Sequence, residues 1–138
     1  DLAAFRRRNN PEKTLLQLFD RDYMEKLHEE DFGVPWNHDA GVLILLISWG
    51  EAVIGIEALL QPPVGEAWSS TGDAYEPGST ILALDDNLGD ITFIEVPPGL
   101  YTVTFNTDGP PCTGPSEILV AADKFAEAWF ECTGGVGP

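Results

Sequence analysis

The sequence predicts an α+β fold that is mainly β: an antiparallel sheet or sandwich of six to seven strands with an N-terminal amphipathic helix. Three observations lead to this prediction. The chain begins with an apolar stripe at helical spacing, continues with six consecutive apolar residues, and then alternates short apolar segments with turns rich in proline, glycine and aspartate. Its 138 residues suit one domain with a core of its own.

The first predicted element is a helix over residues 10–32. Asn10 can cap it, and Pro11 takes the first helical position, where a missing N–H costs nothing. Apolar residues then recur every four positions. Gly33, which is typical of a helix C-terminus, ends the pattern.

The next element is a strand over residues 42–47. All six side chains are apolar, so this strand has no polar face and is predicted to be covered on both sides. Residues 52–60 are predicted to form its antiparallel partner. Residues 61–79, with three prolines and three glycines, are expected to be a surface connection.

The rest of the chain is predicted to be β. Residues 80–84 and 91–96 form strands around a polar turn at 85–90. Residues 100–106 alternate apolar and polar side chains, as a half-exposed strand does. Residues 125–132 fit both a strand and a short helix, and we favour the strand.

The predicted organisation is a single domain, residues 1–138. We expect residues 1–9 to be flexible, residues 41–132 to form the β-domain, and the glycine-rich residues 133–138 to be a flexible tail.

The chain is strongly acidic, and unevenly so. It holds 23 Asp and Glu against 7 Lys and Arg, a net charge of −16. Residues 1–27 hold six of the bases and five acids, or +1, whereas residues 28–138 hold 18 acids and Lys124, or −17. This balance argues against nucleic acid as a direct ligand, because phosphate binding depends on Lys and Arg. No apolar run reaches the ~18 residues of a membrane span, so no membrane partner is expected.

No catalytic motif is present. The chain lacks a nucleophile elbow and a phosphate-binding glycine loop. We therefore predict no catalytic residues, no cofactor and no enzymatic activity; a carboxylate enzyme is the minority alternative.

One acidic turn has the residue types of a calcium site. Asp85, Asn87 and Asp90 offer the hard oxygen ligands that calcium prefers. The same residues are ordinary in hairpin turns, and the bidentate Glu of a complete calcium loop is missing. We predict a turn without metal, with calcium as the alternative.

The two histidines lie ten residues apart. Zinc sites need three or four ligands at characteristic spacing, so we predict that His28 and His38 are exposed side chains at the helix end.

Cys112 and Cys132 leave two possibilities open. They can form a disulfide that closes a loop of about twenty residues, or they can be free thiols in a reducing cytoplasm. We expect a cytoplasmic protein, and a secreted one if the cysteines are bridged.

One stretch carries a family resemblance. Residues 91–104 read as strand, Pro97-Pro98-Gly99-Leu100-Tyr101, strand, and with the preceding apolar segment they resemble small acidic bacterial nuclease inhibitors of competence systems and toxin-immunity proteins. The similarity covers at most residues 42–106. It implies an acidic, β-rich partner of a nuclease.

The predicted function is an acidic protein-binding module, an inhibitor or immunity-type protein that docks on a basic, nucleic-acid-binding protein surface such as that of a nuclease or toxin. The oligomeric state stays open. The residues expected to face the partner lie in predicted turns and loops, with one tryptophan as an interface anchor: Glu51, Asp73, Glu76, Asp85, Asp86, Asp90 and Trp68.

Two alternatives remain. The acidity can serve solubility in a salt-rich cell, with a structural domain and no partner. The chain can also be a secreted or surface β-domain that binds calcium or carbohydrate.

Overall fold

The computed structural model describes residues 21–48, 53–84, 88–106 and 112–132. These residues form, in chain order, α3 (Arg21–Leu27), the π-helical turn η1 (His28–Phe32), β1 (Gly41–Ser48), β2 (Glu57–Gln61), β3 (Glu66–Ser70), β4 (Tyr75–Pro77), β5 (Leu88–Val96), β6 (Gly99–Asn106), β7 (Cys112–Thr113), β8 (Ile118–Val120) and β9 (Phe125–Cys132).

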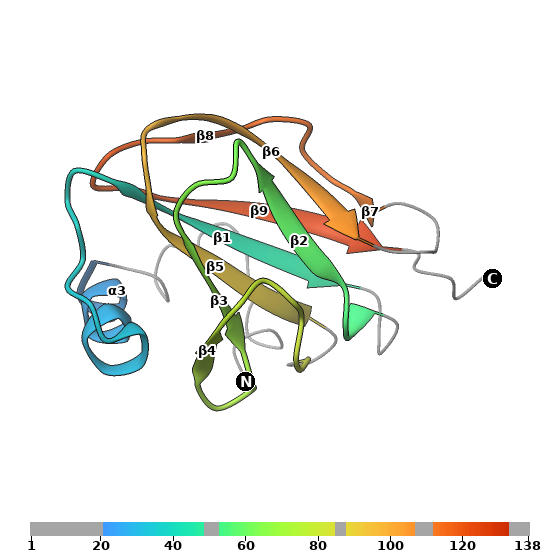
Figure 1. Ribbon diagram of the computed structural model, residues 1–138, viewed down its shortest axis with the longest axis horizontal. Coiled ribbons are helices and arrows are strands. Elements are labelled where there is room, and N and C mark those ends of the chain that lie inside the picture. Colours follow the sequence, from blue (N-terminus) through green and yellow to red (C-terminus); the bar gives the residue numbers. More distant parts are fainter. Residues whose placement is uncertain (1–20, 49–52, 85–87, 107–111, 133–138) are drawn as a thin grey trace, which may run out of the picture.

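The strands form two sheets that pack as a sandwich (Figure 1). One sheet has the order β4-β3-β5-β1-β9-β7, and the other has the order β2-β6-β8. The predicted fold class, a mainly β, sandwich-like α+β fold, is confirmed. The described residues hold nine strands, three of which are only two or three residues long, and every pair is antiparallel except β1 with β9.

β1 is the central strand of the larger sheet, as its sequence predicts. Every residue from Val42 to Ile47 is fully buried. Leu43, Leu45 and Ile47 face the core between the two sheets, while Val42, Ile44 and Leu46 face the outer side. A strand covered on both sides has no face exposed to solvent, where polar side chains would be favourable. This explains the uninterrupted apolar run.

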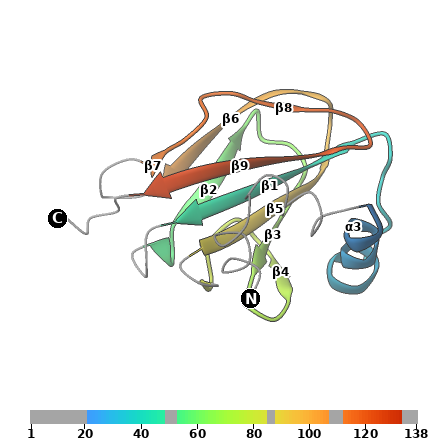
Figure 2. The same cartoon turned by 180° about the vertical axis from the view of Figure 1, so that it is seen from behind.

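The predicted partner of this strand is wrong. β1 lies between β5 and β9, whereas β2, which overlaps the expected partner segment 52–60, pairs with β6 in the other sheet. Seen from behind, β9, β1 and β5 run side by side (Figure 2). Apolar patterning shows that a segment is buried, but not which distant strand completes its hydrogen bonds.

Three other boundaries also differ from prediction. Segment 61–79 is not one connection, because it contains the β3–β4 hairpin. Segment 80–84 has only an isolated bridge between Thr80 and Glu57. Of the turn expected at 85–90, residues 88–90 belong to β5, and residues 85–87 lie outside the described part of the chain.

Other expectations are confirmed. Residues 99–106 form β6, with Tyr101 buried, Val103 and Phe105 half-buried and the intervening side chains exposed. Residues 125–132 form a strand, not a helix. The turn at 97–98 carries the chain from β5 in one sheet to β6 in the other, so these two strands are not a hairpin pair.

The predicted helix ends where its sequence indicates. α3 and η1 cover residues 21–32, and Gly33 follows at φ 73° with its N–H bonded to the carbonyl of His28. Residues 10–20 of the prediction, the expected flexible residues 1–9 and the tail 133–138 lie outside the described residues. Within the described residues no helix has the length and apolar character to cross a membrane.

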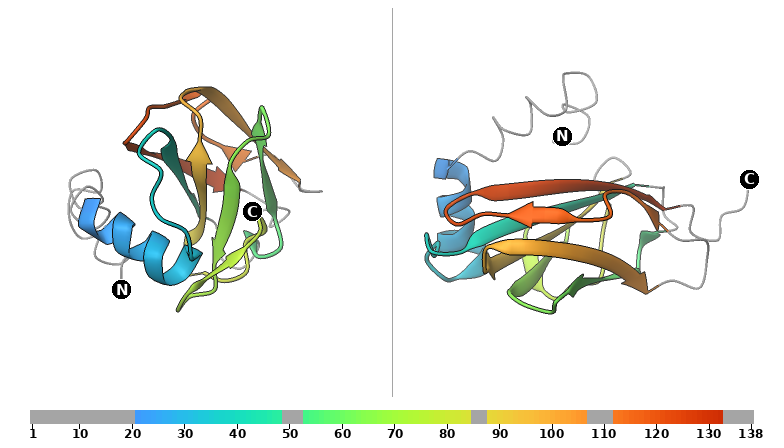
Figure 3. Two further views of the ribbon diagram at one scale, coloured as in Figure 1. Left: turned by 60° about the vertical axis from the view of Figure 1, so that its left-hand side comes forward. Right: turned by 90° about the horizontal axis from the view of Figure 1, so that it is seen from above.

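The helix lies across one end of the sandwich, where β1 and β9 begin (Figure 3). Leu27, Phe32 and Trp36 pack there against the outer face of the larger sheet, in a second apolar cluster separate from the core between the sheets. This end of the molecule therefore brings together α3, η1 and the loop of residues 33–40.

Candidate functional site

Two carboxylates of the helical segment define one side of the candidate site. Glu25 lies in α3 and Glu29 in η1, four residues apart, and both are exposed. Residues at this spacing lie on one helix face, so like charges there destabilise the helix by a few tenths of a kcal/mol, roughly 0.2–0.5. The helix is anchored from the other side by buried Leu27 and Phe32.

The loop of residues 33–40 forms the opposite side. Gly33 has a positive φ, a backbone conformation that suits glycine, and Val34 donates its N–H to the carbonyl of His28 at 3.0 Å. These bonds turn the chain back so that Trp36 becomes buried beside His28, with their rings stacked at 5.9 Å. The indole therefore has a fixed place next to the helix end.

His38 connects this loop to a distant part of the chain. Its Nδ1 lies 2.5 Å from Oδ1 of Asp123, in the turn between β8 and β9, and its Nε2 lies 3.9 Å from Oε1 of Glu25. Asp123 has a φ of 59°, which is uncommon outside glycine, and its N–H bonds to the carbonyl of Ala40. The turn and the loop are thus tied together twice.

These parts enclose an open pocket of about 440 Å³, which we call the Trp36 pocket. It is lined by Glu25, Glu29, Gly33, Val34, Pro35, Trp36 and His38. The rings of Trp36 and His38 lie 5.1 Å apart. Two carboxylates next to an aromatic wall suit a positively charged group that also has an apolar or flat surface.

Only part of the set of residues expected to face a partner lies in the described chain. Asp73 is exposed at the tip of the β3–β4 hairpin, and Glu76 is exposed on β4 opposite Ser69. Trp68 is opposite Pro77, one position along the hairpin, so strand alternation puts Trp68 and Glu76 on opposite faces of the sheet. Glu51, Asp85 and Asp86 lie outside the described residues.

Trp68 and Asp90 contact other side chains of this protein on the outer face of the larger sheet. Trp68 is half-buried, with its ring 5.1 Å from that of Phe32. Asp90 accepts hydrogen bonds from the hydroxyls of Tyr75 and Thr92, so both of its oxygens are engaged.

Of the three residues of the alternative calcium site, Asp90 alone lies in the described part of the chain. Asn87 and Asp85 lie outside it, and Asp90 belongs to β5. Across residues 21–48, 53–84, 88–106 and 112–132, no group of three or more His, Cys, Asp or Glu side chains is placed to hold a metal ion.

The two histidines differ from one another. His38 is exposed, as predicted, but the prediction is wrong for His28, which is 1% exposed. His28 contacts Phe32 edge-on and stacks with Trp36, so it belongs to the packing under the helix end. Its ring occupies the position of an apolar core residue because aromatic neighbours surround it.

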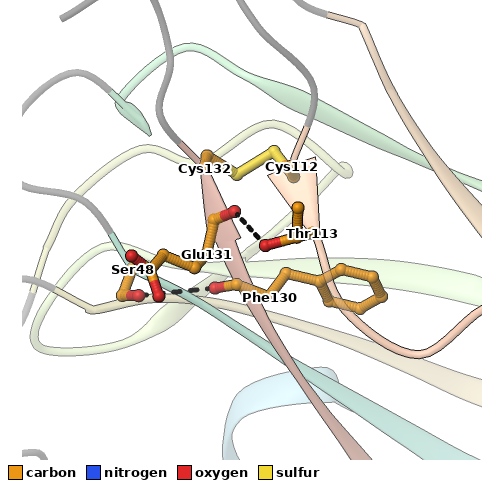
Figure 4. Close-up of a disulfide and its surroundings, with 6 residues drawn as sticks. All are labelled: Ser48, Cys112, Thr113, Phe130, Glu131 and Cys132. Atoms are coloured by element: carbon orange, nitrogen blue, oxygen red, sulfur yellow. Dashed lines mark hydrogen bonds between the residues drawn. A yellow bond between two sulfur atoms is a disulfide. The ribbon is translucent and has the colours of Figure 1, made fainter. Parts of the chain in front are cut away.

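Cys112 and Cys132 form a disulfide, which is one of the two possibilities left open by the sequence (Figure 4). They are directly opposite each other where β7 pairs with β9. Thr113 donates a hydrogen bond to the carbonyl of Glu131, and Ser48 donates one to the carbonyl of Phe130. The disulfide therefore fastens the edge strand β7 to the larger sheet, at the end of β9 away from the Trp36 pocket.

The Trp36 pocket was not predicted from the sequence. Trp36 falls in a segment without repeat or motif, and Asp123 is 85 residues away from its contact His38. The available signal was the pair Glu25 and Glu29 at helical spacing beside a glycine-ended helix. No protein-family model, curated protein or solved structure matches this chain.

Proposed function

We propose that this protein is an acidic protein-binding module that docks on a basic protein surface and, by covering that surface, acts as an inhibitor or immunity-type protein. The observation that carries the proposal is the Trp36 pocket, where exposed carboxylates flank an aromatic wall. Pockets with aromatic and charged side chains are typical of the places where an interface receives a partner's side chain.

The charge around the pocket supports the proposal. Helical residues 21–32 hold five acids against Arg21 and Lys26, and the loop and the β8–β9 turn add Asp39 and Asp123 against Lys124. A concentration of one sign of charge attracts an oppositely charged protein and accelerates its association by roughly 10–10³-fold. The same field repels nucleic acid, so a nucleic-acid-binding protein is a suitable target and nucleic acid itself is not.

The class of partner is part of the proposal. A nuclease or toxin is the partner that the resemblance of residues 91–104 implies, and its phosphate-binding surface has the required positive charge. The Cys112–Cys132 disulfide favours an oxidising compartment over the cytoplasm as the place where docking occurs.

A matched pair of variants tests the proposal. Glu25→Gln with Glu29→Gln removes two charges at the pocket, and Glu117→Gln with Glu131→Gln removes two exposed charges elsewhere. Each immobilised protein is exposed to extract from its native cell at low and high salt, and captured proteins are identified by mass spectrometry. We expect a basic protein that is retained by the wild type and the second variant, is depleted with the first, and is released by salt.

The proposal fails under either of two results. One is a partner held equally by both variants, and the other is capture that salt does not weaken. If a partner is captured as expected, an inhibition assay follows. It combines the purified partner with the wild-type protein and measures the catalytic activity of the partner.

A further inference from the structure

We infer that the Trp36 pocket is a receptor for one arginine side chain, presented by the basic partner. This inference rests on the proposed function and specifies the group that the site recognises. The argument depends on the charges of the pocket, its aromatic wall and the hydrogen bonds that hold its loop.

The charges of the pocket favour a cation. Glu25 and Glu29 repel each other across one helical turn, and both line the pocket. Among the described residues that line it, none is Lys or Arg, and the one basic side chain is His38, whose Nε2 lies 3.9 Å from Oε1 of Glu25. A cation between the two carboxylates removes their repulsion and gains two charge-assisted contacts.

The wall of the pocket selects the shape of that cation. The pocket is lined by the exposed ring of His38 and by the Trp36 indole, which is only 8% exposed and stacks with His28. These two lining rings are tilted by 32° to each other, and the apolar side chains of Val34 and Pro35 lie beside them. A guanidinium is planar, is less strongly hydrated than an ammonium, and stacks on aromatic faces while its N–H groups bond carboxylates. A lysine ammonium is a compact and strongly hydrated charge, which gains less from such a wall.

Contacts within the chain hold the loop of residues 33–40 in place. Val34 is bonded to the carbonyl of His28, Ala40 accepts from the N–H of Asp123, and His38 contacts the Asp123 carboxylate. The loop is therefore fixed to both the helix and the β8–β9 turn. Preorganisation of this kind reduces the entropy that binding costs.

The experiment uses a defined probe in place of the partner. Nα-acetyl-arginine amide is titrated into the isotope-labelled full chain, and chemical shifts are followed by NMR, including the side-chain signals of Trp36 and His38. The matched probes are the lysine and citrulline amides. Citrulline has nearly the shape of arginine but no charge.

We expect saturable shifts centred on Trp36 and His38 with arginine, affinity weaker by about threefold or more with lysine, and no binding with citrulline. Glu25→Gln with Glu29→Gln is expected to weaken arginine binding by roughly tenfold, whereas Glu117→Gln with Glu131→Gln leaves it unchanged. Thermal unfolding confirms that both variants are folded.

Two results overturn the inference. One is equal binding of arginine and lysine with shifts spread over all acidic surfaces, and the other is the absence of shifts at the pocket. If the probe fails while a basic partner is still captured in a charge-dependent manner, the docking function stands and the arginine receptor does not. If neither the probe nor a partner binds, both are wrong.

Discussion

The hydroxyl of Tyr75 donates a 2.6 Å hydrogen bond to Oδ2 of Asp90, reaching from β4 across β3 to β5. Thr92 donates to Oδ1 of the same carboxylate at 3.2 Å. The aspartate that the sequence offers as a calcium ligand therefore serves as an acceptor for two hydroxyls on the outer sheet face. The ring of Phe32, the last residue of η1, lies 5.3 Å from that of Tyr75. The network therefore helps to hold the end of η1 against the sheet.

Removal of the Tyr75 hydroxyl is expected to destabilise the protein. Tyr75→Phe loses a hydrogen bond to a charged acceptor, which typically contributes about 1.5–3 kcal/mol. Tyr101→Phe is the matched control, because its hydroxyl donates to the carbonyl of Pro97, a neutral acceptor on an exposed residue. We expect the control to lose about 1 kcal/mol or less. Denaturant unfolding measures both, and equal stability of Tyr75→Phe and the wild type would contradict the network.

Two leucines test which parts of the sandwich form the core. Leu45 is fully buried between the sheets, whereas Leu119 on β8 is 67% exposed. Leu45→Ala is expected to lower the free energy of unfolding by about 2–5 kcal/mol through lost burial and the cavity it leaves. Leu119→Ala is expected to change it by no more than about 0.5 kcal/mol. A large loss at Leu119 would mean that another surface covers β8 in solution.

The disulfide is expected to contribute substantially to stability. Its 20-residue separation corresponds to about 3 kcal/mol in the chain-entropy model. Cys112→Ala with Cys132→Ala should therefore lower the melting temperature by roughly 10 °C. A reductant should lower the wild type to a similar value and leave the double variant unchanged. A reductant that has no effect on the wild type, together with a mass that indicates two free thiols, would refute the bridge.

Gly33 is expected to be sensitive to backbone conformation and not to side-chain size. A Cβ built at this position meets no atom within 4 Å, but φ is 73°. Gly33→Ala should cost about 1–2 kcal/mol, since an L-residue is strained there. Gly33→Asn should cost less, because asparagine adopts this conformation more readily. Chemical denaturation distinguishes the two, and an alanine variant as stable as the wild type would show that η1 ends differently.

Local patterns in the sequence predict the elements whose burial can be read along the chain. The apolar run 42–47 predicts a doubly covered strand, alternation predicts the half-exposed β6, and Gly33 predicts the end of the helix; all three are confirmed. Each of these three predictions depends on a pattern that extends over only a few neighbouring residues.

Long-range pairing is not encoded in such patterns. The same apolar run is compatible with pairing to 52–60, yet β1 pairs with β5 and β9. The burial of His28 is a second example. Histidine is a polar residue, which favours an exposed position, but its ring is buried because Phe32 and Trp36 pack against it.

The sequence by itself determined that this is a mainly β domain with an acidic surface from residue 28 onward, because composition and periodicity are local properties. Only the tertiary structure decided where acidic side chains line a pocket. The Trp36 pocket brings together α3, η1 and the loop of residues 33–40, and the contact of His38 with Asp123 fixes that loop to the β8–β9 turn. These segments meet because the parallel pairing of β1 with β9 places the beginnings of both strands at the same end of the sandwich.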